Sequence, residues 1–279
     1  MATTTVLTEE GTSNFAQAGN LNVHYNEAGT GDTVVMLHGG GPGASGWSNY
    51  VTNFGPFSEH YRAILMDMPG YGKSDPKEMH EDYRNRINAL ALRDLLDTLG
   101  IEKANVIGNS MGGATAATFA IAYPERINKL VLMGAGGGGA SIMQPMPLEG
   151  IKRIAALFED PTLEGFRELI KIFVYDSSFM TDDLLHQRLA NTLAHPEHLE
   201  ARRKSTKQLE DLSPELSKIQ ADTLIVWGRD DRFVPLDHAL KFLWSIPKSQ
   251  LHVFSGCGHW AQYEKSGEFN TLVLDFLAR

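Results

Sequence analysis

The segment Gly108-Asn109-Ser110-Met111-Gly112 carries the clearest chemical signal in the sequence. It fits the pattern G-x-S-x-G, in which a serine stands on a tight turn between a strand and a helix. The neighbouring segments suit that context, because 104–107 is a short apolar run and 114–123 is Ala-rich and apolar. We therefore expect Ser110 to be an exposed nucleophile at a sheet edge. The alternative is an ordinary glycine-rich turn at the end of a strand.

A serine hydroxyl is a weak nucleophile at neutral pH, so it needs a general base, and the base needs an orienting carboxylate. In folds with such an elbow, the chain order is serine, acid, histidine. His259 follows the last apolar run, 251–254, and is the expected base. Asp230 and Asp231 both follow the run 223–227, and the order of residues does not choose between them.

Other acids and histidines are weaker candidates for these roles. Asp67 and Asp75 follow earlier strands but precede the serine, so their chain order is wrong. The nine remaining histidines lie mostly in polar or helical contexts, which favours the surface; examples are His60, His80, His195 and His198.

The same chemistry requires hydrogen-bond donors aimed at a developing oxyanion. The backbone N–H of Met111, at the start of the expected helix, is one candidate. The second is Gly40, in the glycine run after His38, where the missing side chains let the backbone approach a ligand. A phosphate-binding loop is the alternative for this run, but the lysine and the Ser/Thr of that motif are missing.

The elements that must position these residues alternate regularly along the chain. Helical patterns begin at Gly46 and cover 82–99 and the segment after Ser110, and they separate apolar runs typical of strands. This alternation predicts an α/β protein with a parallel sheet and helices on both faces. The strands are expected at 21–25, 33–37, 61–66, 104–107, 129–133, 223–227 and 251–254.

The alternation stops at the glycine run 136–139, after which residues 141–212 show only helical patterns. We expect 1–140 and 213–279 to form the core and 141–212 to form a helical lid over the carboxyl edge of the sheet, where ligands bind in such folds. The lid helices are expected at 150–158, 163–174, 182–193 and 196–209.

Composition excludes several classes of function. The net charge of −9 argues against a nucleic-acid partner, because phosphate binding requires a basic face. The single cysteine, Cys257, excludes an internal disulfide and favours a reducing compartment, and no second Cys/His cluster suggests a metal site. Residues 1–5 have neither a basic nor an apolar run, and no stretch approaches a membrane span. We expect a cytoplasmic protein.

These motifs together resemble the α/β-hydrolase superfamily and, within it, the meta-cleavage product hydrolases, which hydrolyse a carbon–carbon bond in ring-fission products of aromatic catabolism. The resemblance covers nearly the whole chain, including the lid. It implies an α/β-hydrolase fold with a mostly parallel, eight-stranded sheet. The segments that carry it are 38–44 with 46–49, 108–113, 145–147 with 149–152, 227–235 and 257–262.

The resemblance also assigns roles to single residues. It makes Asp231 the triad acid, with Ser110 and His259, and gives the oxyanion hole to Gly40 and Met111. A planar guanidinium at Arg188 suits a substrate carboxylate, although without the resemblance this residue would be a solvated helix residue. The residues implied around the dienoate end are Gly41, Asn49, Asn109, Ser178, Arg188 and Trp260. Candidates for an apolar pocket around the acyl group, or for ordinary core packing, are Ile151, Ile154, Leu169, Phe173, Phe233 and Val234.

The implied reaction is serine-dependent hydrolysis of a 2-hydroxy-6-oxohexa-2,4-dienoate to 2-hydroxypenta-2,4-dienoate and a carboxylic acid, without a metal or an organic cofactor. The lid favours an aryl or bulky group on C6, and relatives assemble as dimers or larger, so a homo-oligomer is expected. Three alternatives stay open: a carboxylesterase of the same fold, a non-catalytic ligand-binding homologue, and a water-attack route through a gem-diol in place of an acyl-enzyme.

Overall fold

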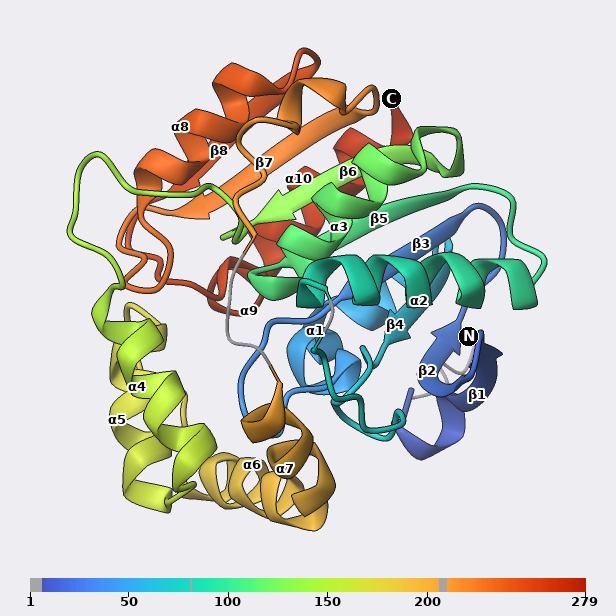
Figure 1. Ribbon diagram of the computed structural model, residues 1–279. Coiled ribbons are helices and arrows are strands. Elements are labelled where there is room, and N and C mark those ends of the chain that lie inside the picture. The colour runs from blue at the N-terminus through green and yellow to red at the C-terminus, as the bar shows by residue number, and fades with distance from the viewer. Residues whose placement is uncertain (1–6, 81, 206–209) are drawn as a thin grey trace, which may run out of the picture.

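The computed structural model describes residues 7–80, 82–205 and 210–279 (Figure 1). The expectation drawn from residues 1–5 concerns a segment outside these ranges, and so do the last residues, 206–209, of the helix expected over 196–209.

One eight-stranded sheet forms the centre of the molecule, with the strand order β1-β2-β4-β3-β5-β6-β7-β8. β2 pairs antiparallel with both β1 and β4, and every other neighbouring pair is parallel. The strands are β1 Ser13–Ala18, β2 Leu21–Ala28, β3 Thr33–Leu37, β4 Arg62–Met66, β5 Ala104–Asn109, β6 Ile127–Met133, β7 Asp222–Gly228 and β8 Ser249–Phe254. The expected mostly parallel sheet is therefore present.

Helices cover both faces of this sheet (Figure 1). The central strands β3 and β5 are buried along their whole length, as strands covered on both faces must be. α2 (Arg84–Thr98), α3 (Met111–Ala122) and α8 (Leu236–Ser245) pack on one face. α1 (Gly46–Ser58) and α10 (Ser266–Ala278) pack on the other, and the short α9 (Ala261–Glu264) contacts both of them.

Four helices between β6 and β7 form a block beside the sheet (Figure 1). Two of them begin at threonine caps: the Thr162 and Thr181 hydroxyls accept hydrogen bonds from the N–H groups of Gly165 and Leu184. The helical block consists of α4 Glu149–Glu159, α5 Leu163–Phe173, α6 Asp182–Ala194 and α7 Pro196–Lys204. All four helices expected from the sequence are present, to within a few residues at their ends.

Two features differ from the sequence-based expectations. β1 was not expected, because Ala18 is its one buried residue and its other side chains give no apolar alternation. Most of the other histidines are exposed or half-buried, but His24, His38 and His238 are buried. His24 and His38 are buried because both ring nitrogens find partners: His24 bonds Asp67 and Ser13, and His38 bonds the Gly39 carbonyl and the Met68 N–H.

No helix among the residues described has the length and apolar character that crossing a membrane demands.

Candidate active site

Ser110 stands on a strained turn between β5 and α3. Its backbone angles are φ 55° and ψ −114°, and it is the one non-glycine residue with positive φ in the described part of the chain. The neighbouring glycines are required by space: a Cβ at Gly108 would lie 2.2 Å from the Gly112 carbonyl oxygen, and one at Gly112 would lie 2.2 Å from that of Leu37. The elbow expected from the sequence is therefore formed.

Asp231 and His259 form the acid–base pair expected beside this serine. Asp231 Oδ2 lies 2.7 Å from His259 Nδ1, and both side chains are 1% exposed. The other carboxylate oxygen, Oδ1, accepts from the N–H groups of Phe233 (2.7 Å) and Val234 (3.0 Å), so the carboxylate cannot rotate freely. Asp230 instead accepts from Gly256 N–H (3.1 Å) and pairs with Arg229, which leaves it a structural role.

The second ring nitrogen of His259 is prepared to accept a proton. Because the Asp231 carboxylate accepts from Nδ1–H, the lone pair is on Nε2. This Nε2 atom is buried and has no hydrogen-bond partner. The His259 loop lies against the serine elbow, since Asn109 Nδ2 donates to the His259 carbonyl at 3.4 Å. An unpartnered basic nitrogen next to the elbow is the arrangement that activates a serine.

Gly40 and Met111 are neighbours above the elbow. A Cβ at Gly40 would lie 3.0 Å from Met111 Sδ and 3.3 Å from Tyr71 Oη, so only a glycine fits here without displacement. Met111 is the first residue of α3, and its N–H therefore has no partner within the helix. The two expected oxyanion donors therefore lie next to each other.

Arg188, on α6, reaches from the helical block onto the core. Its Nε donates to the Pro42 carbonyl (2.9 Å), its Nη1 donates to Ser48 Oγ (3.1 Å), and its guanidinium lies 5.8 Å from the centre of the Trp260 ring. Among the described residues, no carboxylate forms an ion pair with it. Burial lowers the pKa of this guanidinium to about 10, so it is still a cation at neutral pH.

A cavity of about 140 Å³ lies between the helical block and the core, beside Arg188 and Trp260. Three of the residues proposed for an apolar pocket line it: Ile154, Leu169 and Phe173. Ile151, Phe233 and Val234 do not, and Phe233 and Val234 are buried core residues. Gly41 also lines the cavity, directly after the oxyanion candidate Gly40.

Asn49 and Asn109 are buried and linked to each other, since Asn49 Nδ2 donates to Asn109 Oδ1 at 3.4 Å. Ser178 is placed differently. It lies exposed on the turn before α6 and donates its N–H to Asp176 (2.9 Å), and it is not among the residues that line the cavity. Of the expected dienoate residues, Gly41, Arg188 and Trp260 line the cavity, whereas Asn49, Asn109 and Ser178 do not.

Glu264, on α9, is a residue that sequence reasoning missed. Its carboxylate accepts from the N–H groups on either side of the base, those of Gly258 (3.0 Å) and Trp260 (3.1 Å). It also accepts from Tyr175 N–H (2.7 Å), just after α5. A lone glutamate in a short helix carries no sequence signal for this role, and one of its three partners, Tyr175, lies 89 residues away along the chain.

The comparisons with known proteins identify the family of the chain. The family model described as the alpha/beta hydrolase fold matches residues 32–170 and 180–266. The chain belongs to this α/β-hydrolase family. The unmatched segment, 171–179, contains Ser178, one of the expected dienoate residues that do not line the cavity.

Within the α/β-hydrolase family, the chain belongs with the meta-cleavage product hydrolases. It is 53% identical to a 2-hydroxy-6-oxo-6-phenylhexa-2,4-dienoate hydrolase from Comamonas testosteroni, over 98% of this chain and 99% of the relative. It is 50% identical to a 2-hydroxy-6-oxononadienedioate/2-hydroxy-6-oxononatrienedioate hydrolase from the same organism, over 98% and 94%. A solved meta-cleavage product hydrolase from Pseudomonas fluorescens IP01 superposes with a TM-score of 0.83 at 33% identity, covering 95% of this chain and 97% of that one.

Proposed function

We propose that this α/β-hydrolase cleaves the C5–C6 bond of 2-hydroxy-6-oxohexa-2,4-dienoates, giving 2-hydroxypenta-2,4-dienoate and a carboxylic acid. The observation that carries the proposal is Arg188, a buried guanidinium without a carboxylate partner among the described residues, beside a cavity that Gly41 and Trp260 also line. A simple esterase has no need of such a cation. A dienoate supplies the missing carboxylate, and the planar guanidinium binds it through paired hydrogen bonds.

The reaction begins by creating an electron sink, because carbon is a poor leaving group. Transfer of the 2-hydroxyl proton from O2 to C5 ketonises the dienol while Arg188 holds the carboxylate. His259 then takes the Ser110 proton, Ser110 Oγ attacks the C6 carbonyl carbon, and the N–H groups of Gly40 and Met111 stabilise the oxyanion. Collapse breaks the C5–C6 bond, and its electron pair passes into the departing dienolate. The dienolate oxygen O2 takes the proton held by His259, which gives 2-hydroxypenta-2,4-dienoate and frees the base.

The acyl group now remains on the serine, and water activated by His259 releases it as a carboxylic acid. A route through a gem-diol, in which water attacks C6 directly, is the main mechanistic rival. Rapid quenching of the reaction followed by mass spectrometry separates the two routes, because only the first gives an acylated Ser110 peptide.

The walls of the cavity favour an uncharged aryl or alkyl group on C6. Arg188 is the only cationic residue among those that line it, and the dienoate carboxylate uses this cation. A substrate with a second carboxylate would leave that group facing apolar side chains, at a large desolvation cost. The apolar lining includes Phe166, Leu169, Ile170, Phe173, Met180 and Leu185.

The helical block acts as the lid of this site, within the division into core (1–140 and 213–279) and lid (141–212). The lid contributes Arg188 and the apolar wall, while the core contributes the triad. We also place the enzyme in the cytoplasm, because its one cysteine is buried and unpaired. We further propose a homo-oligomer, because Trp244, on α8, is 93% exposed, as an apolar interface residue would be in an isolated chain. Sedimentation at several concentrations checks the assembly.

Substitution of Arg188 tests the proposed function. Arg188→Gln should lower kcat/KM for a 6-phenyl dienoate by roughly 100-fold or more, because a buried charged hydrogen bond is lost. Hydrolysis of a 4-nitrophenyl ester should change little. Arg167→Gln, which removes an exposed arginine from the same lid, is the matched control. Equal losses of kcat/KM on the dienoate and the ester would show that Arg188 has only a structural role. A native enzyme that prefers neutral esters to dienoates would be a carboxylesterase.

Loss of Ser110 separates an enzyme from a ligand-binding homologue. Ser110→Ala should bind the coloured dienoate but turn it over at a small fraction of the native rate. Labelling of the native protein by a fluorophosphonate, absent in Ser110→Ala, reports the same nucleophile without any substrate. Near-native turnover by Ser110→Ala would rule out the serine mechanism.

A further inference from the structure

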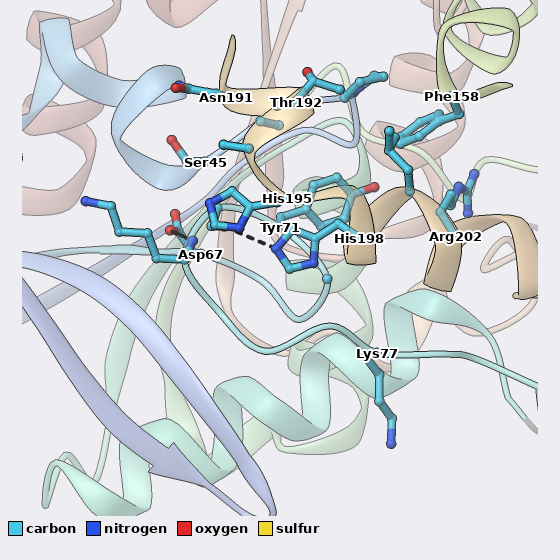
Figure 2. Close-up of a pocket in the computed structure, with 18 of the residues that line it drawn as sticks. Ser45, Asp67, Tyr71, Lys77, Phe158, Asn191, Thr192, His195, His198 and Arg202 are labelled. Carbon is cyan, nitrogen blue, oxygen red and sulfur yellow. Dashed lines mark hydrogen bonds between the residues drawn. The ribbon is translucent and has the colours of Figure 1, made fainter. Parts of the chain in front are cut away.

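A second and larger cavity, of about 340 Å³, lies between α7 of the helical block and the core loop that follows β4. Figure 2 shows this cavity, with the imidazoles of His195 and His198 side by side near its centre. It has no role in the chemistry proposed above. Its distinctive feature is a group of three possible metal ligands in one short segment, His195-Pro196-Glu197-His198.

The ligand atoms of His195, Glu197 and His198 all lie within 4.8 Å of one another. The two rings have centroids 5.2 Å apart. Two imidazoles bound to one tetrahedral zinc ion, each at about 2.0–2.1 Å, have centroids roughly 5 Å apart, so the pair already has the necessary spacing. The Glu197 carboxylate lies 3.0 Å from His195 Nδ1, at the edge of the same space.

An independent observation comes from the hydrogen bonds of His198. Its Nε2 lies 3.1 Å from the Gly72 carbonyl oxygen and must donate to it, which leaves the lone pair on Nδ1. That Nδ1 atom is buried and has no hydrogen-bond partner. A metal-binding histidine is normally held in this way, with one ring nitrogen donating to a carbonyl and the other free for the ion.

Charged groups also surround these ligands. Glu197 and Asp67 are the carboxylates that act on the His198 ring. The cations that line the same cavity are Lys73, Lys77, Arg84 and Arg202. In Figure 2, Arg202 is beside the Phe158 ring, 5.1 Å from its centre, and Lys77 points away below.

We propose that His195, Glu197 and His198 form a binding site for a divalent ion of the zinc and nickel type, with water in the remaining positions. Nitrogen and carboxylate ligands suit such ions better than they suit Mg²⁺ or Ca²⁺. A cation on Nδ1 polarises the His198 ring and strengthens its Nε2–H bond to Gly72. The ion therefore fastens the start of α7 to the core and takes no part in catalysis.

Titration of untagged protein with NiCl₂ and with ZnCl₂, followed by calorimetry, tests the proposal. The native protein should bind one equivalent and show a higher Tm with the ion. His195→Ala and Glu197→Gln should each weaken binding by more than about tenfold and remove the Tm increase. Both side chains lie outside the core, so these variants should fold normally. His198→Ala is a weaker test, because it also removes the bond to Gly72.

His80→Ala is the matched control, because His80 forms the same kind of exposed pair with Glu78, at 2.9 Å, and no third ligand joins them among the described residues. It should bind the ion as the native protein does. The proposal is overturned if the native protein binds no ion, if His195→Ala binds as tightly as the native protein, or if His80→Ala loses binding to the same extent. Each result is independent of dienoate turnover, so a failure here leaves the proposed function standing.

Discussion

The Phe233 ring lies nearly parallel to the His259 imidazole, with centroids 5.0 Å apart and planes 20° apart. Phe233 is 2% exposed, and its own N–H binds Asp231, so one residue supports both the acid and the base. The sequence left Phe233 open between pocket lining and core packing. Its position in the structure gives it a different task, which is to hold the plane of the base.

Phe233→Leu should therefore lower kcat by roughly tenfold or more and leave KM within about twofold, because a tilted base misses the serine proton while the substrate still binds. Steady-state kinetics with the dienoate measure kcat and KM separately. Phe119→Leu controls for stability, since Phe119 is equally buried and packs on Tyr123, away from the triad. The same loss of kcat in both variants would show that Phe233 acts only through core packing and does not orient the base.

Glu264 should be a positioning residue for the base. Glu264→Gln keeps one acceptor oxygen but turns an NH₂ group toward one of the backbone donors, so we expect a kcat loss of about 10- to 100-fold and a stability loss of about 1–3 kcal/mol. Dienoate binding by the double variant with Ser110→Ala should change much less. Glu268→Gln, on the exposed side of α10, is the control. A variant with native kcat would show that the three hydrogen bonds to Glu264 do not position the base.

Gly40→Ala should impair the oxyanion hole. The new methyl group would lie 3.0 Å from Met111 Sδ and 3.3 Å from Tyr71 Oη, so the two backbones must move apart. Loss of one oxyanion donor costs about 10²–10³ in kcat, and we expect the lower end here. Gly55→Ala is the control, because nothing lies within 4 Å of its new methyl group. It should retain activity and gain about 0.5–1 kcal/mol in helix stability.

The pH dependence of dienoate affinity should follow Arg188. Burial lowers its pKa to about 10, and only the protonated guanidinium attracts a carboxylate. Affinity of Ser110→Ala for the dienoate should therefore stay constant from about pH 6 to 9 and fall as the pH rises through the lowered pKa. Spectroscopic titration of the bound chromophore measures this. A midpoint near neutral pH would instead indicate that a histidine holds the carboxylate.

The lowered pKa of Arg188 should make the free energy of unfolding rise with pH, whereas it should make dienoate affinity fall. The unfolded arginine keeps its proton to higher pH than the folded one, so the buried cation reduces the free energy of unfolding at neutral pH and the penalty is relieved as the pH rises above about 10. Arg188→Gln should remove this part of the pH dependence, which denaturant unfolding at several pH values detects.

Local patterns allowed the sequence to predict the sheet, the elbow and the base. Glycines 108 and 112 fix the Ser110 turn through contacts within one strand–turn–helix unit, and such units have a sequence signature. The choice between Asp230 and Asp231 was beyond any local pattern, because it depends on which carboxylate the distant His259 loop meets. Only the resemblance decided it before the structure placed Asp231 at 2.7 Å.

Long-range contacts explain what the sequence could not predict. Glu264 and Ser48 owe their roles to groups far along the chain, Tyr175 and Arg188, and neither has a motif of its own. The burial of His24 likewise depends on Asp67, which is 43 residues away. For Ser178, the expected role came from the resemblance alone. In the structure, its N–H donates to Asp176 on the exposed turn before α6.

The backbone N–H of His259 donates a 2.8 Å hydrogen bond to the carbonyl of Phe173, the last residue of α5. This bond joins the general base to the helical block. Glu264 makes a parallel link one step away, through Tyr175. Because α5 belongs to the helical block and His259 to the core, the alignment of the imidazole depends on how these two parts of the chain pack against each other.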